Sequence, residues 1–257
     1  MSHLINTKYD TLCNDKESDI YQHLPTLYRY AKECETIFET GVRGCVSSWA
    51  FVKGLLENGS SKKYILMNDL YECDIKELLY SVKGLDIQAE YVWKNNLTLD
   101  MSGNVDLTFI DTWHVYGQLK RELEKFSKTT NKYIILHDTT VDGIYGETLR
   151  NKTFHGTFRF YMTDVINFFY TELQKGAPPN YAAHLVQEYF NEKHIGNMMK
   201  GIQEIHEESK STGIPLEEII GGLQKAVDEF LSSNPQWILH EKYENNNGLT
   251  ILKRVSM

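Results

Sequence analysis

The sequence predicts an α/β protein with a doubly wound, mostly parallel sheet that ends in an antiparallel hairpin. Short apolar segments alternate with amphipathic segments from residue 36 to residue 138. These short segments are apolar throughout, which is typical of parallel strands covered by helices on both faces. Near the C-terminal end two strand-like segments flank Asn247-Gly248, a residue pair that favours a hairpin turn.

The predicted elements follow one another in the rhythm that such a sheet requires. Residues 1–35 are expected to be a helical segment, with Ser18 and Asp19 capping one of its helices. Strands are then predicted over 36–39, 64–67, 87–93, 105–110 and 133–136, and helices over 47–58, 74–82 and 116–126.

Residues 139–215 interrupt this alternation. The segment is rich in aromatic residues, glycine and histidine, and we expect loops and helices that form a lid over the sheet. A helix over 216–231 and hairpin strands in 237–243 and 249–254 complete a single domain that spans residues 1–257.

Composition limits the classes of function. The chain has 257 residues, 41% of them hydrophobic, which is enough for one large domain. A net charge of -8 argues against a general nucleic-acid binder. The chain shows no apolar signal core, no apolar run of transmembrane length and no paired cysteine motif. We therefore expect a cytoplasmic protein with a small-molecule or glycan substrate, no membrane partner, and self-association as an open alternative.

The most informative motif is T-I-F-E-T-G-V-R-G-C-V-S-S, residues 36–48. An apolar run ends in Glu39, Gly41 and Gly44 follow, and a helix start comes next. Glycines permit a sharp turn close to a ligand, and a helix start offers free N–H groups. The acid disfavours a pyrophosphate and favours a ligand with an amino group, such as S-adenosylmethionine (SAM). A plain structural turn is the alternative interpretation.

Three further motifs extend the pattern: F-I-D-T-W-H-V-Y (109–116), I-I-L-H-D-T-T (134–140) and N-N-N-G-L-T-I-L-K-R (245–254). With these motifs in this order, residues 36–255 resemble the class I SAM-dependent methyltransferase superfamily. The closest resemblance is to the branch of sugar O-methyltransferases and cephalosporin-hydroxylase-like proteins. It implies a Rossmann-like fold, SAM as the methyl donor and a sugar or glycan hydroxyl as the acceptor.

The resemblance also implies a SAM-binding edge at the carboxyl ends of the strands. Its expected residues are Glu39, Thr40, Gly41, Arg43, Gly44, Ser48, Asp69 and Asp111. Glu39 would accept from the amino group of SAM, and Asp69 would hold the ribose hydroxyls. Arg43 pairs either with the SAM carboxylate or with a nearby acid, and Ser47 and Ser48 cap a helix or touch that carboxylate. Adenine is expected near residues 93–96, unless Trp93 belongs to the core.

Asp111 and Asp138 end neighbouring predicted strands, so their carboxylates should lie side by side. Two such groups repel unless a proton or a cation lies between them, and Mg²⁺ suits oxygen ligands. The spacing of Asp111 and His114 matches the metal-dependent macrolide-type sugar O-methyltransferases. His137 replaces an acid of that pattern, so the missing ligand is either an oxygen of Asp142 or a nitrogen of His137.

His114 is the expected general base, because a neutral imidazole can take the proton of an attacking hydroxyl. Asp111 and His137 are the other catalytic candidates; the alternative for His114 is a helix cap or packing near Trp113. Three other functions are alternatives. These are methylation of a small phenolic or natural-product hydroxyl, binding of a partner without catalysis, and dinucleotide-dependent oxidation. The missing third glycine and the terminal hairpin oppose the last.

Overall fold

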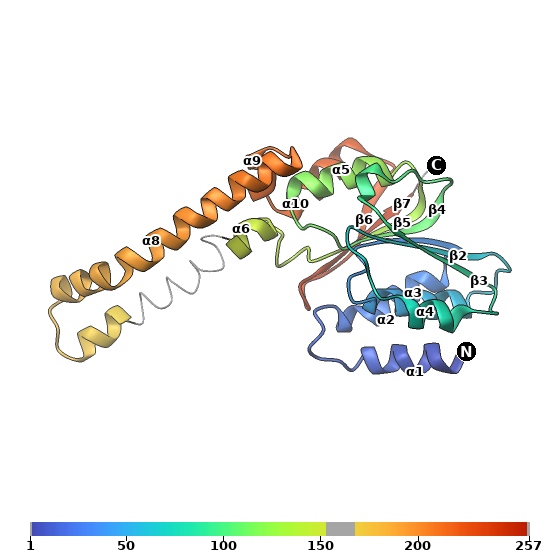
Figure 1. Ribbon diagram of the computed structural model, residues 1–257, viewed down its shortest axis with the longest axis horizontal. Coiled ribbons are helices and arrows are strands. Elements are labelled where there is room, and N and C mark those ends of the chain that lie inside the picture. Colours follow the sequence, from blue (N-terminus) through green and yellow to red (C-terminus); the bar gives the residue numbers. More distant parts are fainter. Residues whose placement is uncertain (1, 153–167, 256–257) are drawn as a thin grey trace.

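The computed structural model describes residues 2–152 and 168–255, which contain a seven-stranded sheet of order β3-β2-β1-β4-β5-β7-β6 (Figure 1). The strands are β1 (Thr36–Thr40), β2 (Lys63–Asp69), β3 (Ile87–Trp93), β4 (Val105–Ile110), β5 (Thr130–His137), β6 (Trp237–Tyr243) and β7 (Leu249–Arg254). The first five strands pair in parallel, and β7 pairs antiparallel with both β5 and β6. The predicted doubly wound, mostly parallel sheet with a C-terminal antiparallel hairpin is confirmed.

Helices cover both faces of the sheet, as a doubly wound fold requires. The helices are α1 (Ser2–Leu12), α2 (Leu24–Lys32), α3 (Val46–Glu57), α4 (Lys76–Val82), α5 (Tyr116–Phe126), α6 (Glu147–Lys152), α8 (Pro179–Thr212), α9 (Leu216–Ile220) and α10 (Leu223–Ser233). Figure 1 shows α1 to α4 on one face and α5 and α10 on the other.

Each face has its own hydrophobic core. Successive side chains of a strand point to opposite faces, so Ile37 joins the core under α1 to α4 and Phe38 joins the core under α5 and α10. The ring of Phe51 on α3 lies 5.3 Å from that of Phe109, and the ring of Phe126 on α5 lies 5.0 Å from that of Phe38. The central strands are therefore packed between two layers of apolar side chains.

The register of the strands creates the site. Thr40 of β1 lies opposite both Asn68 of β2 and Ile110 of β4, and Ile110 lies opposite Leu136 of β5. The strands therefore end at one level. The residues that follow them meet along a single edge, where a doubly wound sheet binds its ligands.

The expected cap at Ser18 and Asp19 is wrong. Helix α2 begins only at Leu24, after a 3₁₀ turn over Tyr21–His23, and its capping residue His23 makes no side-chain hydrogen bond to the helix. The carboxylate of Asp19 instead accepts a hydrogen bond from Arg43. Asp19 thus makes a tertiary contact instead of capping the helix.

The continuous helix expected over 216–231 is also wrong, because Gly221 and Gly222 separate α9 from α10 in extended conformations. The Gly221 carbonyl accepts from the backbone N–H of Tyr116 at 2.7 Å. A Cβ on Gly222 would lie 2.4 Å from the carbonyl oxygen of Gly143. The break lets the chain pack against the loop that follows β5.

The predicted insertion contains α6, a helical stretch over 168–174, and the 34-residue helix α8. Residues 153–167 of it lie outside the described residues, and its role as a lid stays a prediction. Figure 1 shows α8 extending away from the sheet. No helix in the described part of the chain has the length and apolar character needed to span a membrane.

Candidate active site

The turn after β1 depends on one of its two glycines. Gly41 has a φ of +91°, and a Cβ there would lie 1.7 Å from the carbonyl oxygen of Asp111. Gly44 is different, because a Cβ on it would meet only the Val46 side chain at 3.9 Å. The other left-handed residues of the turn are Arg43 and Cys45. The conformation of the turn therefore requires glycine at 41 and not at 44, and the expected approach of SAM to Gly44 stays a prediction.

Glu39, at the end of β1, has no exposed surface. Its two carboxylate oxygens accept hydrogen bonds from the hydroxyls of Ser47 at 2.5 Å and Ser48 at 2.6 Å. Neither serine caps α3, whose capping residue is Cys45, so the capping interpretation is wrong. Burial, offset in part by the two serine hydroxyls, raises the pKa of Glu39 to about 7. In this conformation Glu39 anchors the start of α3 to β1.

Asp69 joins the turn to the loop after β2. One oxygen accepts from the backbone N–H of Arg43 and the other from that of Tyr71, each at 2.9 Å. The guanidinium of Arg43 donates to Asp19 at 3.0 Å. Of the two partners expected for Arg43, the structure thus shows the nearby acid. Trp93 is 62% exposed, so it does not belong to the hydrophobic core. The acid expected to bind ribose therefore lies against the turn expected to bind methionine.

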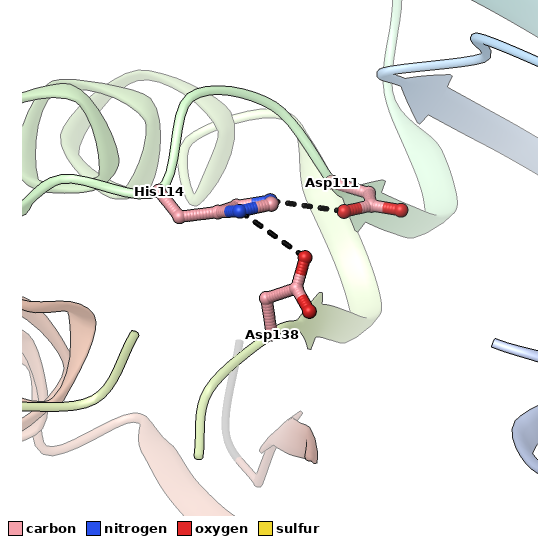
Figure 2. Close-up of side chains that lie close together, drawn as sticks. All are labelled: Asp111, His114 and Asp138. Carbon is pink, nitrogen blue, oxygen red and sulfur yellow. Dashed lines mark hydrogen bonds and ion pairs between the residues drawn. The ribbon is translucent and has the colours of Figure 1, made fainter. Parts of the chain in front are cut away.

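His114 lies among four carboxylates, two of which are drawn in Figure 2. Its Nε2 is 3.0 Å from Oδ1 of Asp111. Its Nδ1 is 3.1 Å from Asp138, 3.3 Å from Asp142 and 3.4 Å from Glu147. The following helix α5 is capped by Val115 without a side-chain bond, so the capping alternative for His114 is wrong.

These contacts change the protonation of the cluster. Burial lowers the pKa of the His114 imidazole, but the adjacent carboxylates of Asp111, Asp142 and Asp138 outweigh it and hold that pKa well above its usual value. The pKa of Asp111 is lowered despite burial, because His137 and His114 stabilise its charge. Burial raises the pKa of Asp138. The surrounding carboxylates therefore favour the protonated form of His114, whereas a general base acts from the neutral form.

His137 and Asp138 form the other side of the cluster. His137 is 1% exposed, and its Nδ1 lies 3.5 Å from Asp111 and 3.6 Å from Asp138. Its Nε2 lies 3.3 Å from the carbonyl oxygen of Asn246, in the β6–β7 turn. Three buried atoms here lack a hydrogen-bond partner: Nδ1 of His114, Nδ1 of His137 and Oδ1 of Asp138. Unpartnered buried polar atoms are uncommon and indicate a missing ligand or a functional site.

Two residues of the cluster gave no signal in the sequence. Glu147, at the start of α6, accepts from the backbone N–H of His114 at 3.2 Å. Arg150 makes two hydrogen bonds to the fully buried Asp142, at 2.6 and 3.0 Å. Both lie beyond the loop after β5, where no periodic pattern fixes the path of the chain. Asp142, considered for its oxygen, does reach the cluster.

A second buried polar group lies beneath the edge. One oxygen of Glu122 on α5 accepts from Thr112, Asn96 and Gln118, while its other oxygen has no hydrogen-bond partner. Glu122 also borders a cavity of about 10 Å³ that His114 and His137 line. This network fixes the loop that carries Asp111 and His114 to α5.

The cluster suits a metal ion by its donor atoms. Among the described residues, ligand atoms of Asp111, His114 and Asp138 lie within 4.8 Å of one another. Two carboxylates and an imidazole are donors that divalent cations accept. The predicted juxtaposition of Asp111 and Asp138 is therefore present.

Comparison with known proteins gives similarity of structure only. No family model matches the sequence, and no curated protein matches it either. The chain is similar to a methyltransferase of Podospora anserina with bound S-adenosylhomocysteine (SAH), at 13% identity and a TM-score of 0.47, over 98% of this chain and 88% of that one. It is also similar to an O-methyltransferase of Streptomyces achromogenes in complex with SAM, at 10% identity and a TM-score of 0.47, over 92% and 81% of the two chains. An O-methyltransferase of Bacillus cereus in complex with SAH has 12% identity and a TM-score of 0.45, over 98% and 89%.

Proposed function

We propose that this protein is a SAM-dependent O-methyltransferase that acts on a hydroxyl of a sugar or glycan. The observation that carries the proposal is the pairing of His114 with Asp111 at 3.0 Å. Asp111 follows β4, and its carbonyl lies directly beside Gly41 in the turn after β1, where SAM is expected to bind. A base thus lies where an acceptor hydroxyl would meet a methyl donor. The choice of a sugar rests on the resemblance of the sequence motifs.

The residues at the ends of β1 and β2, which form the first half of the sheet edge, fit SAM. Asp69 is bonded to the backbone of the turn at 2.9 Å, yet each of its oxygens keeps a lone pair for a ribose hydroxyl. SAM, when bound, would supply a methyl group on a positively charged sulfur. The chain would hold the donor by its ribose and methionine ends, and Glu39, which accepts from both serine hydroxyls, would also accept from the amino group of SAM.

The residues at the ends of β4 and β5, which form the second half of the sheet edge, would deprotonate the acceptor. His114 accepts the hydroxyl proton as the oxygen attacks, and Asp111 holds the imidazole ring in place. A divalent cation on Asp111 and Asp138 would offset the negative charge that keeps His114 protonated and would lower the pKa of the acceptor hydroxyl. Asp142, fixed by Arg150, then stabilises the imidazolium that results.

Binding and turnover can be tested separately. SAM and SAH should raise the melting temperature and bind in calorimetric titrations, whereas NAD should do neither. Asp69→Asn should weaken SAM binding by about 1–3 kcal/mol through lost charge-assisted hydrogen bonds. The exposed Asp74 on the same loop offers a matched control, Asp74→Asn, that should bind like the wild type.

The acceptor is identified by SAH release in a screen of nucleotide sugars, glycans and phenols. Release with phenols alone would replace the sugar by the small-molecule alternative. SAM binding without release from any acceptor would favour the non-catalytic binding protein. Wild-type SAM affinity in a folded Asp69→Asn variant would remove the ribose assignment.

A further inference from the structure

We infer that the cation at this edge is a first-row transition ion and that His137 supplies a nitrogen ligand to it. The inference rests on the proposed function and deepens it by naming the class of metal. It starts from a buried atom with no hydrogen-bond partner, Nδ1 of His137.

The tautomer of His137 follows from its other nitrogen. Nε2 lies 3.3 Å from the Asn246 carbonyl oxygen, which can only accept a hydrogen bond, so Nε2 carries the proton. In the neutral ring Nδ1 then carries a lone pair. The side chain is 1% exposed, so bulk water does not reach that lone pair.

The lone pair faces two carboxylates. Nδ1 lies 3.5 Å from Oδ1 of Asp111 and 3.6 Å from Oδ2 of Asp138. An electron pair and two anionic oxygens repel one another unless a proton or a metal ion lies among them, and a metal ion bound there would take the place of the proton. Ligand atoms about 2.0–2.2 Å from one metal ion lie roughly 3.0–3.6 Å from each other, and the observed spacings fall in that range.

The surroundings of the ring are those of a metal ligand. A ligating histidine usually donates its second N–H to a carbonyl or a carboxylate, which fixes the orientation of the ring. For His137 the acceptor is the Asn246 carbonyl, in a turn whose carbonyls also lie 2.9 and 3.1 Å from Nε2 of His23. The hairpin turn thus holds His137 with its Nδ1 toward the carboxylates.

His114 is less suited to the same task. Both of its nitrogens already face carboxylates, Nε2 toward Asp111 at 3.0 Å and Nδ1 toward Asp138 at 3.1 Å. Its Nε2 is already hydrogen-bonded to Asp111, and the proposed function uses this ring to exchange a proton, so His137 is the imidazole left to bind the cation. Mg²⁺ prefers oxygen ligands, whereas imidazole suits later ions of the first row, so a site with a nitrogen ligand favours Co²⁺ or Zn²⁺ over Mg²⁺.

The test uses metal binding alone, with neither SAM nor an acceptor. Protein stripped with EDTA is titrated with Mg²⁺, Co²⁺ and Zn²⁺, and the visible spectrum of bound Co²⁺ is recorded. Co²⁺ should bind about 10²-fold more tightly than Mg²⁺. His137→Gln should weaken Co²⁺ roughly 10–100-fold and change its spectrum, while His114→Gln should leave the spectrum in place.

Pulsed electron paramagnetic resonance of bound Mn²⁺ gives a measurement that no variant's folding can affect, because coupling to an imidazole nitrogen should appear in the wild type. Equal affinity for Mg²⁺ and Co²⁺, or Mn²⁺ without nitrogen coupling, would overturn the inference. A Co²⁺ spectrum that changes with His114→Gln and not with His137→Gln would also overturn it. A chain that binds Co²⁺ through His137 but not SAM retains this site and loses the proposed function.

Discussion

The two halves of the sheet edge differ in how their charges are satisfied. At the ends of β1 and β2, each carboxylate oxygen of Glu39 and Asp69 accepts a hydrogen bond from the chain itself. At the ends of β4 and β5, four carboxylates surround His114, and three buried atoms have no hydrogen-bond partner. The first half is complete without a ligand, and the second is not.

This contrast assigns different work to the halves. A satisfied polar network rigidifies the chain around it, whereas an incomplete one costs stability and persists where function needs it. The β1–β2 half therefore serves as a preformed support for a cofactor, and the β4–β5 half holds the groups that exchange protons or bind a cation. Substitutions in the first should change stability and affinity, and in the second turnover.

The largest expected effect is on turnover, at His114. His114→Gln should lower kcat by roughly 10²–10⁴, the usual range for a lost general base, while the Kd for SAM stays within a factor of about two. The exposed histidine of α1 gives the control, since His3→Gln should retain full activity. A His114→Gln enzyme with near-normal kcat would contradict the role assigned to the β4–β5 half and would make His137 the candidate for proton transfer.

The next effect is on stability, at the turn. Gly41→Ala should lower the free energy of unfolding by about 3 kcal/mol or more, because the new Cβ meets the Asp111 carbonyl at a positive φ. Gly44→Ala is the matched control within the same turn and should keep wild-type stability, as its Cβ has space. Urea unfolding of both variants checks this. Equal losses would mean that the turn, rather than the Asp111 contact, requires both glycines.

Much of the first half of the edge could be predicted from sequence. The strand ends and Gly41 follow from local signals, because an apolar run and a glycine turn are set by a few adjacent residues. The partners of Ser47 and Ser48 could not be predicted, since a serine at a helix start caps it by default. Here the buried carboxyl of Glu39, at the end of the preceding strand, accepts from both hydroxyls.

The second half was predicted only in part. Asp111, His114 and Asp138 follow from strand register, which the sequence suggests. Glu147 and Arg150 reach the cluster through a loop whose course depends on the break at Gly221 and Gly222. The sequence predicted a continuous helix there, so their approach to His114 could not be foreseen.

The smallest of the three expected effects concerns the charge of Glu39. It is measured as the change in the free energy of unfolding with pH. Its pKa is about 7 in the folded protein, against 4.5 for an unperturbed carboxyl. The folded state thus binds this proton more tightly than the unfolded state does. Its contribution to stability is full below about pH 4.5 and is lost as the pH rises through about 7.

Between pH 5 and pH 8 the wild type should therefore lose roughly 2–3 kcal/mol relative to Glu39→Gln, whose amide cannot ionise and can still bond both serines. The exposed Glu72 provides the control Glu72→Gln, whose stability should follow the wild type at every pH. A difference between wild type and Glu39→Gln that is constant with pH would show that the carboxylate stays charged in the empty protein. Glu39 would then be ready to receive the amino group of SAM without first losing a proton, and SAM affinity would not weaken below pH 7. If the difference varies as expected, SAM affinity should fall below pH 7, because an ammonium group bonds only the ionised carboxylate.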